Sequence, residues 1–478
     1  MASAIRLQSI GIKTTIFEAN NYPGGKLTLI EKDGFRFDAG PSLFTLPRLL
    51  DDVYKSAGLN PRDYYQFEQV PVACHYFWPD GKKFNAFYDK VALKAELEKQ
   101  LEIDGNVVLN YLEHSKKLYT EAGEIFLNNS LHKAKTWLSK DVLQTLLQIS
   151  KYDLFKSMNA ANETRLQDPK LVQLFNRYAT YNGSNPYQAP GILNSIPHLE
   201  FNEGTFFPKG GMHSITEGLY KAALDLGVVF NFNHRVDEII VKNKKVEGVK
   251  SKGKIHQAEL VISNMDIYPT YEKLLPTQKT PTRVKTQERS SSGLIFYWGI
   301  NRAFSELGLH NIFFSGDYKT EFSQLFEEKT IGNDPTVYVN ITSKLNPSDA
   351  PKGTENWFVL INAPSNEGQD WKAITKQTRT NVIKKLSTML GCDFSQYIVT
   401  EEVLDPIGIE AKTSSFKGSL YGTSSNDRMA AFLRHPNFSS SVKNLYFAGG
   451  SVHPGGGIPL CLLSAKITAS LIKSDLKI

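Results

Sequence analysis

The stretch MASAIRLQSIGIKTTIFEANNYPGGK (residues 1–26) determines the fold class that we expect for this chain. Residues 2–8 are typical of a helix, and residues 13–17 of an apolar, β-branched strand. A helix followed by such a strand is the second half of a βαβ unit, in which the acid that binds a ribose lies about 20 residues after a glycine-rich turn. Glu18 ends the strand. The sequence lacks the first strand and a GxGxxG turn, and both are expected immediately upstream of Met1.

A second glycine-rich stretch, NLYFAGGSVHPGGGIPLCLLSAKITASLI (residues 444–472), predicts a strand over residues 445–448 and a helix that begins at Ile458. The free N–H groups at a helix start favour an anion or an electron-rich ring. This stretch cannot be the missing GxGxxG turn, because a βαβ unit needs roughly 30 residues and only 21 follow Gly457. We therefore expect a strand and a helix that join an existing sheet and line a ligand. A glycine-rich turn without a ligand is the alternative.

Three shorter motifs lie between these ends. PGGK (residues 23–26) and GFRFDAGPS (residues 34–42) place glycines where the backbone can approach a phosphate or a flat ring closely. After FFPKGGM and a helix, a strand and a small meander follow, and Val236 there is placed to offer backbone hydrogen bonds to a nucleobase. The alternatives are an ordinary acid before a Pro-Gly turn, an ordinary strand end and a core valine.

Composition limits the function classes. The 478 residues suggest two or three interleaved domains, and the hydrophobic fraction of 41% is that of a folded chain. Lys and Arg exceed Asp and Glu by 55 − 49 = 6, which argues against nucleic acid as a partner. Cys74, Cys392 and Cys461 form no CxxC motif, and the ten histidines have no ligand spacing, so we expect reduced thiols and no metal. We expect neither a membrane-spanning helix nor a secretion signal.

The middle of the chain predicts two further regions. Residues 92–180 are mostly helical by their apolar spacing, and LIFYWGI, PTVYVNI and ENWFVLINA after position 285 predict strands of a second sheet, followed by a helix from about Lys372 to Leu390. The basic, apolar run over residues 131–159 predicts a helix that either lies in a bilayer interface or lines a buried cavity.

Taken in order, Glu18, PGGK, GFRFDAGPS, FFPKGGM, the Val236 meander with SNMD, and the terminal GGSVHPGGGIPL resemble the bacterial carotenoid desaturases, the phytoene-desaturase-related flavoproteins. FNRYATYNGSNPYQAP (residues 175–190) and HPGGGIPL are most similar to the branch that desaturates 1-hydroxycarotenoids at the 3,4 position. The resemblance implies an α/β fold like that of glutathione reductase and the amine oxidases: a Rossmann FAD-binding domain, a mixed-sheet substrate domain and a helical, membrane-facing lobe. The division that we expect assigns residues 1–60, 204–270 and 405–478 to the FAD-binding domain, 61–91, 181–203 and 271–404 to the substrate domain, and 92–180 to the lobe.

The resemblance also implies roles for individual residues. Glu18 would bind the adenosine ribose and Val236 the adenine, whereas the remaining FAD contacts are expected from Gly25, Lys26, Pro41, Ser42, Gly449, Gly450, Ser451, Gly457, Ile458 and Pro459. His453 and Glu203 are candidate bases, with structural roles as the alternative. Aromatic residues of YFWPDGKKFNAFY (residues 76–88) and LIFYWGI are expected to line a substrate tunnel. Because the glycine turn would lie upstream of Met1, we expect a chain that starts at Met1 to retain FAD weakly.

The function that this resemblance implies is FAD-dependent desaturation of a carotenoid, by hydride transfer to the flavin and loss of a proton from the adjacent carbon. Phytoene or dehydrosqualene is the alternative substrate, and a carotenoid-binding protein without cofactor is the alternative of another class. A nicotinamide-dependent dehydrogenase fits less well, since no catalytic pair for a polar substrate is evident. Either a quinone or oxygen fits as electron acceptor, and the expected location is the cytoplasmic face of the cell membrane, with peripheral attachment.

Overall fold

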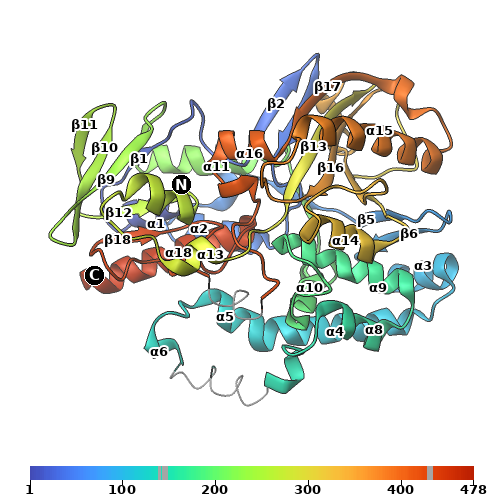
Figure 1. Cartoon of the computed structure of the whole chain (residues 1–478), viewed down its shortest axis with the longest axis horizontal. Helices are drawn as coiled ribbons and strands as arrows, with labels where there is room; N and C mark the ends of the chain where they lie inside the picture. Colours follow the sequence, from blue (N-terminus) through green and yellow to red (C-terminus); the bar gives the residue numbers. More distant parts are fainter. Residues whose placement is uncertain (138–141, 143–148, 428–433) are drawn as a thin grey trace.

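The helix and strand that residues 1–26 predict are both present in the computed structural model of the protein. Helix α1 spans Ala2–Gln8, and strand β1 spans Thr15–Phe17. The structure describes residues 1–137, 142, 149–427 and 434–478. Figure 1 shows β1 on the same side of the molecule as both chain termini, and a larger sheet with its helices on the other side.

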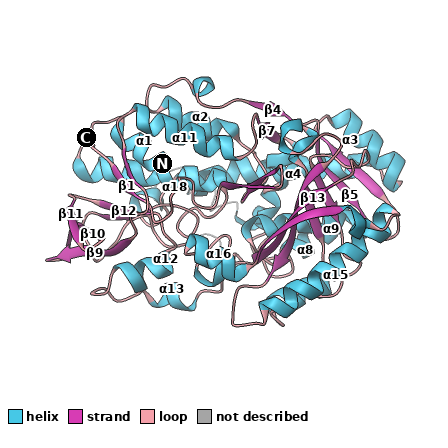
Figure 2. Cartoon of the chain, turned by 90° about the horizontal axis from the view of Figure 1, so that it is seen from above, coloured by secondary structure: helices cyan, strands magenta, loops and turns pink. Residues whose placement is uncertain are grey.

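The parallel strands of the nucleotide-binding region form two pairs. Strand β1 pairs in parallel with β8 (Val229–Asn231), and β12 (Val261–Ser263) pairs in parallel with β18 (Leu445–Phe447). Apolar residues of α1 share one core with those of α2 (Pro47–Lys55), α11 (His213–Asp225) and the C-terminal helix α18 (Ile458–Leu476). Figure 2 shows α1, α2 and α11 gathered together beside the parallel strands. The predicted strand over residues 445–448 and the helix start at Ile458 are thus confirmed.

Three small antiparallel sheets accompany the two parallel pairs. The expected meander comprises β9, β10 and β11, and its apolar residues share a core with β18. A hairpin joins β2 to β3, and β4 pairs with β7. Their bounds are Thr28–Lys32 (β2), Phe35–Ala39 (β3), Phe67–Gln69 (β4), Phe206–Pro208 (β7), Val236–Lys242 (β9), Lys245–Ser251 (β10) and Lys254–Gln257 (β11).

The second sheet has seven strands in the order β17-β13-β16-β15-β14-β5-β6, and all neighbours are antiparallel except β14 and β5. This mixed sheet confirms the predicted strands after position 285 and adds two strands from an earlier segment. The bounds are Val72–Phe77 (β5), Lys83–Phe87 (β6), Ser292–Ile300 (β13), His310–Phe313 (β14), Val337–Asn340 (β15), Glu355–Ala363 (β16) and Ile398–Leu404 (β17).

The two faces of this sheet have different neighbours. Phe296, Trp298 and Trp357 point to one face and share a core with Val382 and Leu386 of α15 (Trp371–Leu390). Because successive residues of a strand point to opposite faces, residues between them face the other way. That second face borders the cavity described below.

A helical lobe packs beside the sheet (Figure 1). Leu93, Leu112, Leu171 and Phe175 from its helices share a core with Tyr76 of β5. The helices of this region are α3 (Lys90–Glu96), α4 (Gly105–Leu118), α5 (Glu124–Asn128), α6 (Ala134–Trp137), α8 (Met158–Leu166), α9 (Pro169–Asn176) and α10 (Pro197–Phe201), with shorter turns η5 (Arg177–Asn182) and η6 (Gly191–Ser195). The remaining helices that we use are α12 (Ile267–Pro269), α13 (Thr282–Thr286), α14 (Tyr318–Phe326) and α16 (Pro406–Thr413).

The predicted helix over residues 131–159 falls largely outside the described residues, because 138–141 and 143–148 are not described. Within the described part of this stretch, α6 covers Ala134–Trp137 and a 3₁₀ turn covers Ile149–Tyr152. Within the described ranges, we find no helix with both the length and the apolar character needed to cross a bilayer.

Candidate functional site

A cavity with a volume of about 3010 Å³ extends from the glycine-rich segments to the seven-stranded sheet. Pockets for single drug-sized ligands usually measure about 300–1,000 Å³. This cavity is therefore large enough for more than one ligand. We call the part lined by residues from 18–42, by Val236 and by residues 449–451 and 456–459 the glycine half, and the part lined by β13–β16 and the helical lobe the sheet half.

All twelve residues that the sequence assigns to cofactor binding line this one cavity. They come from segments more than 400 residues apart, which α18 and the β2–β3 hairpin bring together. The twelve are Glu18, Gly25, Lys26, Pro41, Ser42, Val236, Gly449, Gly450, Ser451, Gly457, Ile458 and Pro459.

Two glycines show that the glycine half is shaped for a bulky ligand. Gly25 and Gly457 have φ values of +58° and +97°, and a Cβ added at either position would have no atom within 4 Å. A side chain at either position would therefore project into open space that the backbone leaves free. Gly457 directly precedes α18, so a ligand that filled this space would lie against the N-terminus of that helix.

Charged side chains lie at both ends of the glycine half. One carboxylate oxygen of Glu18 accepts a hydrogen bond from the backbone N–H of Asn20 at 2.8 Å, which fixes the carboxylate at the end of β1. The ammonium of Lys26 donates to the carbonyl of Leu420 at 2.9 Å. Burial lowers the pKa of Lys26, and Asp266 opposes this shift.

Hydrogen bonds hold the loop between β18 and α18 in place. The backbone N–H of Gly449 donates to the Ser464 hydroxyl at 3.0 Å, and the Ser451 hydroxyl accepts from the backbone N–H of Ile267 at 2.9 Å. The Ser451 hydroxyl accepts in this contact, so its own O–H remains a donor for a cofactor, while the contact anchors the loop backbone.

The sheet half is lined by one face of the mixed sheet. Alternate residues of four neighbouring strands point into it: Ile295 and Tyr297 of β13, Phe358 and Leu360 of β16, Tyr338 of β15, and His310 and Ile312 of β14. Helical-lobe residues face them, including Leu193, Ile196 and Leu199. A long, mostly apolar ligand therefore fits between the sheet and the lobe.

Polar groups interrupt this apolar lining at two places. The Ser42 hydroxyl lies 2.8 Å from the Tyr338 hydroxyl, which lies 2.7 Å from Nδ1 of His310. Separately, Arg177 donates to the Tyr76 hydroxyl at 2.8 Å and to Glu200 at 3.3 Å. Burial raises the pKa of the Glu200 carboxyl, although Arg177 opposes this shift.

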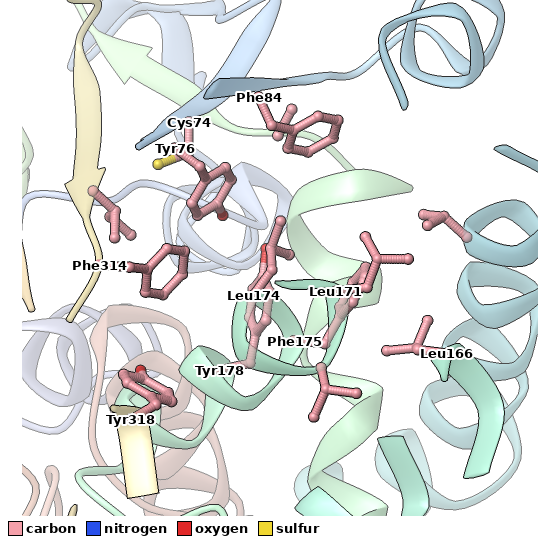
Figure 3. Close-up of a cluster of buried hydrophobic side chains, with 14 of the residues drawn as sticks. Cys74, Tyr76, Phe84, Leu166, Leu171, Leu174, Phe175, Tyr178, Phe314 and Tyr318 are labelled. Atoms are coloured by element: carbon pink, nitrogen blue, oxygen red, sulfur yellow. The ribbon is translucent and has the colours of Figure 1, made fainter. Parts of the chain in front are cut away.

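Aromatic rings support the Arg177 cluster from behind. The Tyr76 ring stacks on Phe314 at 5.8 Å, and Phe314 in turn contacts Tyr318 edge to face at 5.8 Å. Figure 3 shows these three rings with Cys74 and Tyr178 around them. Tyr178 also donates its hydroxyl hydrogen to Glu200 at 2.7 Å. The cluster is thus fixed by protein groups on several sides.

Neither candidate base lies in the cavity wall. The imidazole of His453 is buried outside it and lies with Nε2 2.8 Å from the carbonyl oxygen of Asn129; burial lowers the pKa of His453 to about 4. Glu203 is half-exposed and lies beside Arg48 and His198. Both residues therefore have structural contacts rather than contacts with the cavity.

The structure corrects the expectation about which aromatic residues line a substrate tunnel, because successive residues of a strand point to opposite faces of the sheet. Within LIFYWGI, Ile295 and Tyr297 line the cavity, whereas Phe296 and Trp298 pack against α15 on the opposite face. No residue of 76–88 lines the cavity; Tyr76 and Phe84 belong instead to the core between the sheet and the lobe. Aromatic content identified the sheet but could not indicate which face each ring occupies.

The comparisons with known proteins agree with this geometry. A family model described as flavin containing amine oxidoreductase matches residues 1–473. The chain belongs to the flavin-containing amine oxidoreductases. It is 48% identical over 474 residues to a 1-hydroxycarotenoid 3,4-desaturase from Flavobacterium sp. (strain P99-3), covering 99% of this chain and 96% of that protein. It is 33% identical to a 4,4'-diapolycopene oxygenase from Methylomonas sp, covering 100% of this chain and 96% of that protein.

Solved structures show the same fold. Cyclohexylamine oxidase from Brevibacterium oxydans IH-35A aligns over 100% of this chain and 97% of its own, with a TM-score of 0.63 at 16% identity. The predicted FAD-binding α/β fold with a mixed-sheet domain is thus confirmed. This member of the flavin-containing amine oxidoreductases is an FAD-dependent oxidoreductase. The open space at Gly25 and Gly457 fits FAD, which these residues, Lys26 and the start of α18 would hold.

Sequence analysis missed the polar residues of the sheet half, namely His310, Tyr338, Arg177 and Glu200. His310 and Tyr338 lie in short strands, HNIF and VYVN, in which polar residues interrupt the apolar ones, and this interruption is the signal that could have found them. Arg177 lies inside the quoted FNRYATYNGSNPYQAP motif, but nothing in its spacing pairs it with Glu200.

Proposed function

We propose that this flavoprotein desaturates a carotenoid, and that its substrate is a 1-hydroxycarotenoid that it converts to the 3,4-didehydro product. The observation that carries this proposal is the continuity of the cavity: one space joins the glycine half to a long apolar sheet half. The similarity to a 1-hydroxycarotenoid 3,4-desaturase supports the choice of substrate. The 4,4'-diapolycopene oxygenase indicates that related chains also act on acyclic carotenoids.

The residues of the glycine half would bind the cofactor. Glu18 and Val236 would receive the adenosine end, and Gly449, Gly450 and Ser451 the pyrophosphate or ribitol. Pro41, Ser42, Gly457, Ile458 and Pro459 would surround the flavin ring, with Gly25 and Lys26 beside it. FAD, when bound, would supply a two-electron oxidant for the hydride lost from one substrate carbon, while the neighbouring carbon loses a proton to solvent.

The sheet half would position the substrate and exclude water. A polyene offers few groups for hydrogen bonding, so its position depends on the shape and apolar character of the walls. Tyr297, Phe358 and Leu360 form one wall, and Leu193, Ile196 and Leu199 form the other. We also propose the division into domains given above, with the seven-stranded sheet in the substrate domain together with residues 181–203, whose η6 and α10 pack against the lobe helices.

Anaerobic mixing with candidate substrates tests this function. FAD-loaded protein is mixed with a 1-hydroxycarotenoid, with phytoene or with dehydrosqualene; loss of the oxidised-flavin band is followed, and products are identified by mass. We expect the hydroxycarotenoid to reduce the flavin and to lose two hydrogen atoms. Conversion of phytoene or dehydrosqualene alone would establish the alternative substrate. Binding of a carotenoid without any flavin reduction would support the carotenoid-binding protein.

We further propose that the protein attaches to the cytoplasmic face of the cell membrane, from which a lipid-soluble substrate would enter. The basic, apolar stretch of residues 131–159 supports this, since such segments bind anionic lipid surfaces. Sedimentation with anionic liposomes should decrease when Lys133, Lys135, Lys140 and Lys151 are all replaced by Glu. Replacing Lys352, which precedes β16, and three lysines of α15 (Lys372, Lys376 and Lys384) is the matched control. Equal loss in both variants would contradict a specific role for the stretch.

The electron acceptor in this proposal is a quinone or oxygen.

A further inference from the structure

A chain of hydrogen-bonding groups crosses the cavity wall where its two halves meet. It runs from the Ser42 hydroxyl to the Tyr338 hydroxyl (2.8 Å) and on to Nδ1 of His310 (2.7 Å). The Asn340 side-chain amide nitrogen also lies 3.2 Å from Nδ1. His310 is 2% exposed, and it lines the cavity.

These contacts determine the tautomer of His310. The Asn340 amide nitrogen donates to the carbonyl of Leu309 at 3.0 Å, which identifies it as nitrogen rather than oxygen. An amide nitrogen is a donor only, so Nδ1 of His310 must be an acceptor. Tyr338 then donates to Nδ1 and accepts from the Ser42 hydroxyl. In the neutral imidazole, the hydrogen is therefore on Nε2.

The Nε2–H group of His310 has no partner among the described residues, although it is buried. A buried donor that remains unpaired is unfavourable, and most such groups in folded proteins have a partner. Burial lowers the pKa of His310 to about 3, so the imidazole is neutral at physiological pH. A ligand that satisfies this group must offer an acceptor, and a neutral donor suits a neutral acceptor such as a hydroxyl oxygen.

The distance along the substrate places its hydroxyl group close to the flavin. In a 1-hydroxycarotenoid the oxygen is three bonds from carbon 3 and four from carbon 4, which is at most about 5 Å because a bond of about 1.5 Å advances an extended chain by only about 1.2 Å. A hydroxyl-binding group must therefore lie beside the reacting carbons. Two hydrogen bonds connect His310 to Ser42, which the proposed cofactor site places next to the flavin ring, so His310 lies at the flavin end of the sheet half.

We infer that Nε2–H of His310 donates a hydrogen bond to the hydroxyl oxygen of a hydroxylated polyene and thereby determines which carbon–carbon bond faces the cofactor. His310 is then a positioning residue, Tyr338 and Asn340 orient it, and a polyene without the hydroxyl is disfavoured because the donor stays unpaired. The inference rests on the proposed function. Tyr297 and Tyr318 also carry buried hydroxyls without a partner in the described part of the chain, but no neighbour fixes the direction of their hydrogens.

The test compares a 1-hydroxycarotenoid with the same polyene lacking the hydroxyl. FAD-loaded full-length protein is used in two assays: kcat/KM for desaturation, and Kd from the shift of the polyene absorption band with the flavin held reduced, so that no turnover occurs. His310→Phe should reduce the preference for the hydroxylated polyene by about 10- to 100-fold, in kcat/KM and in Kd, as expected for the loss of one buried hydrogen bond. His310→Gln, whose amide can donate, should recover part of it. Tyr297→Phe tests the other buried hydroxyl on the same face of the sheet, and Tyr54→Phe, which removes a buried hydroxyl outside the cavity, should leave the ratio unchanged.

The possible outcomes separate this inference from the proposed function. If the protein binds the hydroxylated polyene preferentially through His310 but does not desaturate it, the proposed function fails and the inference stands. If desaturation occurs and His310→Phe changes both substrates equally, the inference is wrong and the function stands. A lost preference in Tyr297→Phe instead would assign the hydroxyl to that residue. If His310→Phe does not fold, Tyr338→Phe decides the matter, because loss of its hydroxyl should lower the ratio by at least about 3-fold.

Discussion

The two halves of the cavity are built in different ways. The glycine half consists of short sequence motifs whose backbone shape makes room for a ligand, as at Gly25 and Gly457. The sheet half consists of alternate side chains from four strands, such as Tyr297, His310 and Phe358. The residues next to them along each strand point to the opposite face of the sheet. A site made from backbone is therefore recognisable along the sequence, whereas a site made from one sheet face depends on strand order and register.

The largest expected effect separates the two faces of β16. Leu360 lines the cavity, whereas the adjacent Ile361 is fully buried against α15. Ile361→Ala should lower the free energy of unfolding by about 2–5 kcal/mol, because it leaves a void in a packed core, with KM little changed. Leu360→Ala should cost less stability and should raise KM for the polyene. Urea unfolding and steady-state kinetics check both; a KM effect in Ile361→Ala alone would contradict the assignment of faces.

The next effect concerns the glycine half alone. Gly457→Val should weaken FAD binding by about 100-fold or more, because the new side chain fills the proposed ligand space and the backbone at φ +97° does not suit valine. Gly368→Val is the matched control, since Gly368 has φ +96°, no atom within 4 Å of an added Cβ, and a position outside the cavity. Flavin fluorescence titration of each variant measures the affinity. Equal losses would show that backbone strain, and not the ligand space, is responsible.

A pH effect of intermediate size involves one histidine near each half. Burial lowers the pKa of His310 to about 3 and that of His453 to about 4, from 6.5. Between these values and pH 6.5, the two imidazoles are protonated in the unfolded chain but stay neutral in the folded chain. The free energy of unfolding therefore falls as the pH drops from 6.5 towards these values. At about pH 5 the loss should be about 2 kcal/mol for each histidine.

Denaturant unfolding at several pH values, with His310→Gln and His453→Gln, checks this dependence. Both variants should show a weaker fall in stability, whereas only His310→Gln should alter the preference for a hydroxylated substrate. A pH dependence identical to that of the unchanged protein would contradict the assigned shifts.

The smallest effect sharpens the assignment of Lys26. Lys26→Met should slow flavin reduction by about 10-fold, through loss of a charge beside the proposed ring position, a difference of about 1.4 kcal/mol. Lys32→Met is the control, because Lys32 ends the strand that follows Lys26 and donates to the carbonyl of Glu401 at 2.7 Å, away from the cavity. Stopped-flow absorbance measures the rate. An unchanged rate in Lys26→Met would place this lysine in a structural role.

Local signals in the sequence predicted the nucleotide-binding region, and the resemblance of its motifs to a flavoprotein family predicted the cofactor. Residues 2–8 and 458–472 have helical spacing, Glu18 and the glycine runs are local signals, and all twelve proposed cofactor residues line one cavity. Such signals survive in a sequence because backbone conformation and helix starts depend on neighbouring residues.

Only the tertiary structure decided the composition of the sheet half. In the structure, His453 and Glu203 lie outside the cavity wall, and Phe296 and Trp298 pack against α15. Ser42 and Tyr338, which are 296 residues apart in the sequence, lie within hydrogen-bond distance of each other. The sequence pattern of a strand predicts that alternate residues share a face of the sheet. It does not predict which of the two faces lines a cavity, because strand order and register determine this. The tautomer of His310 likewise follows from Tyr338 and Asn340, which strand pairing places beside it.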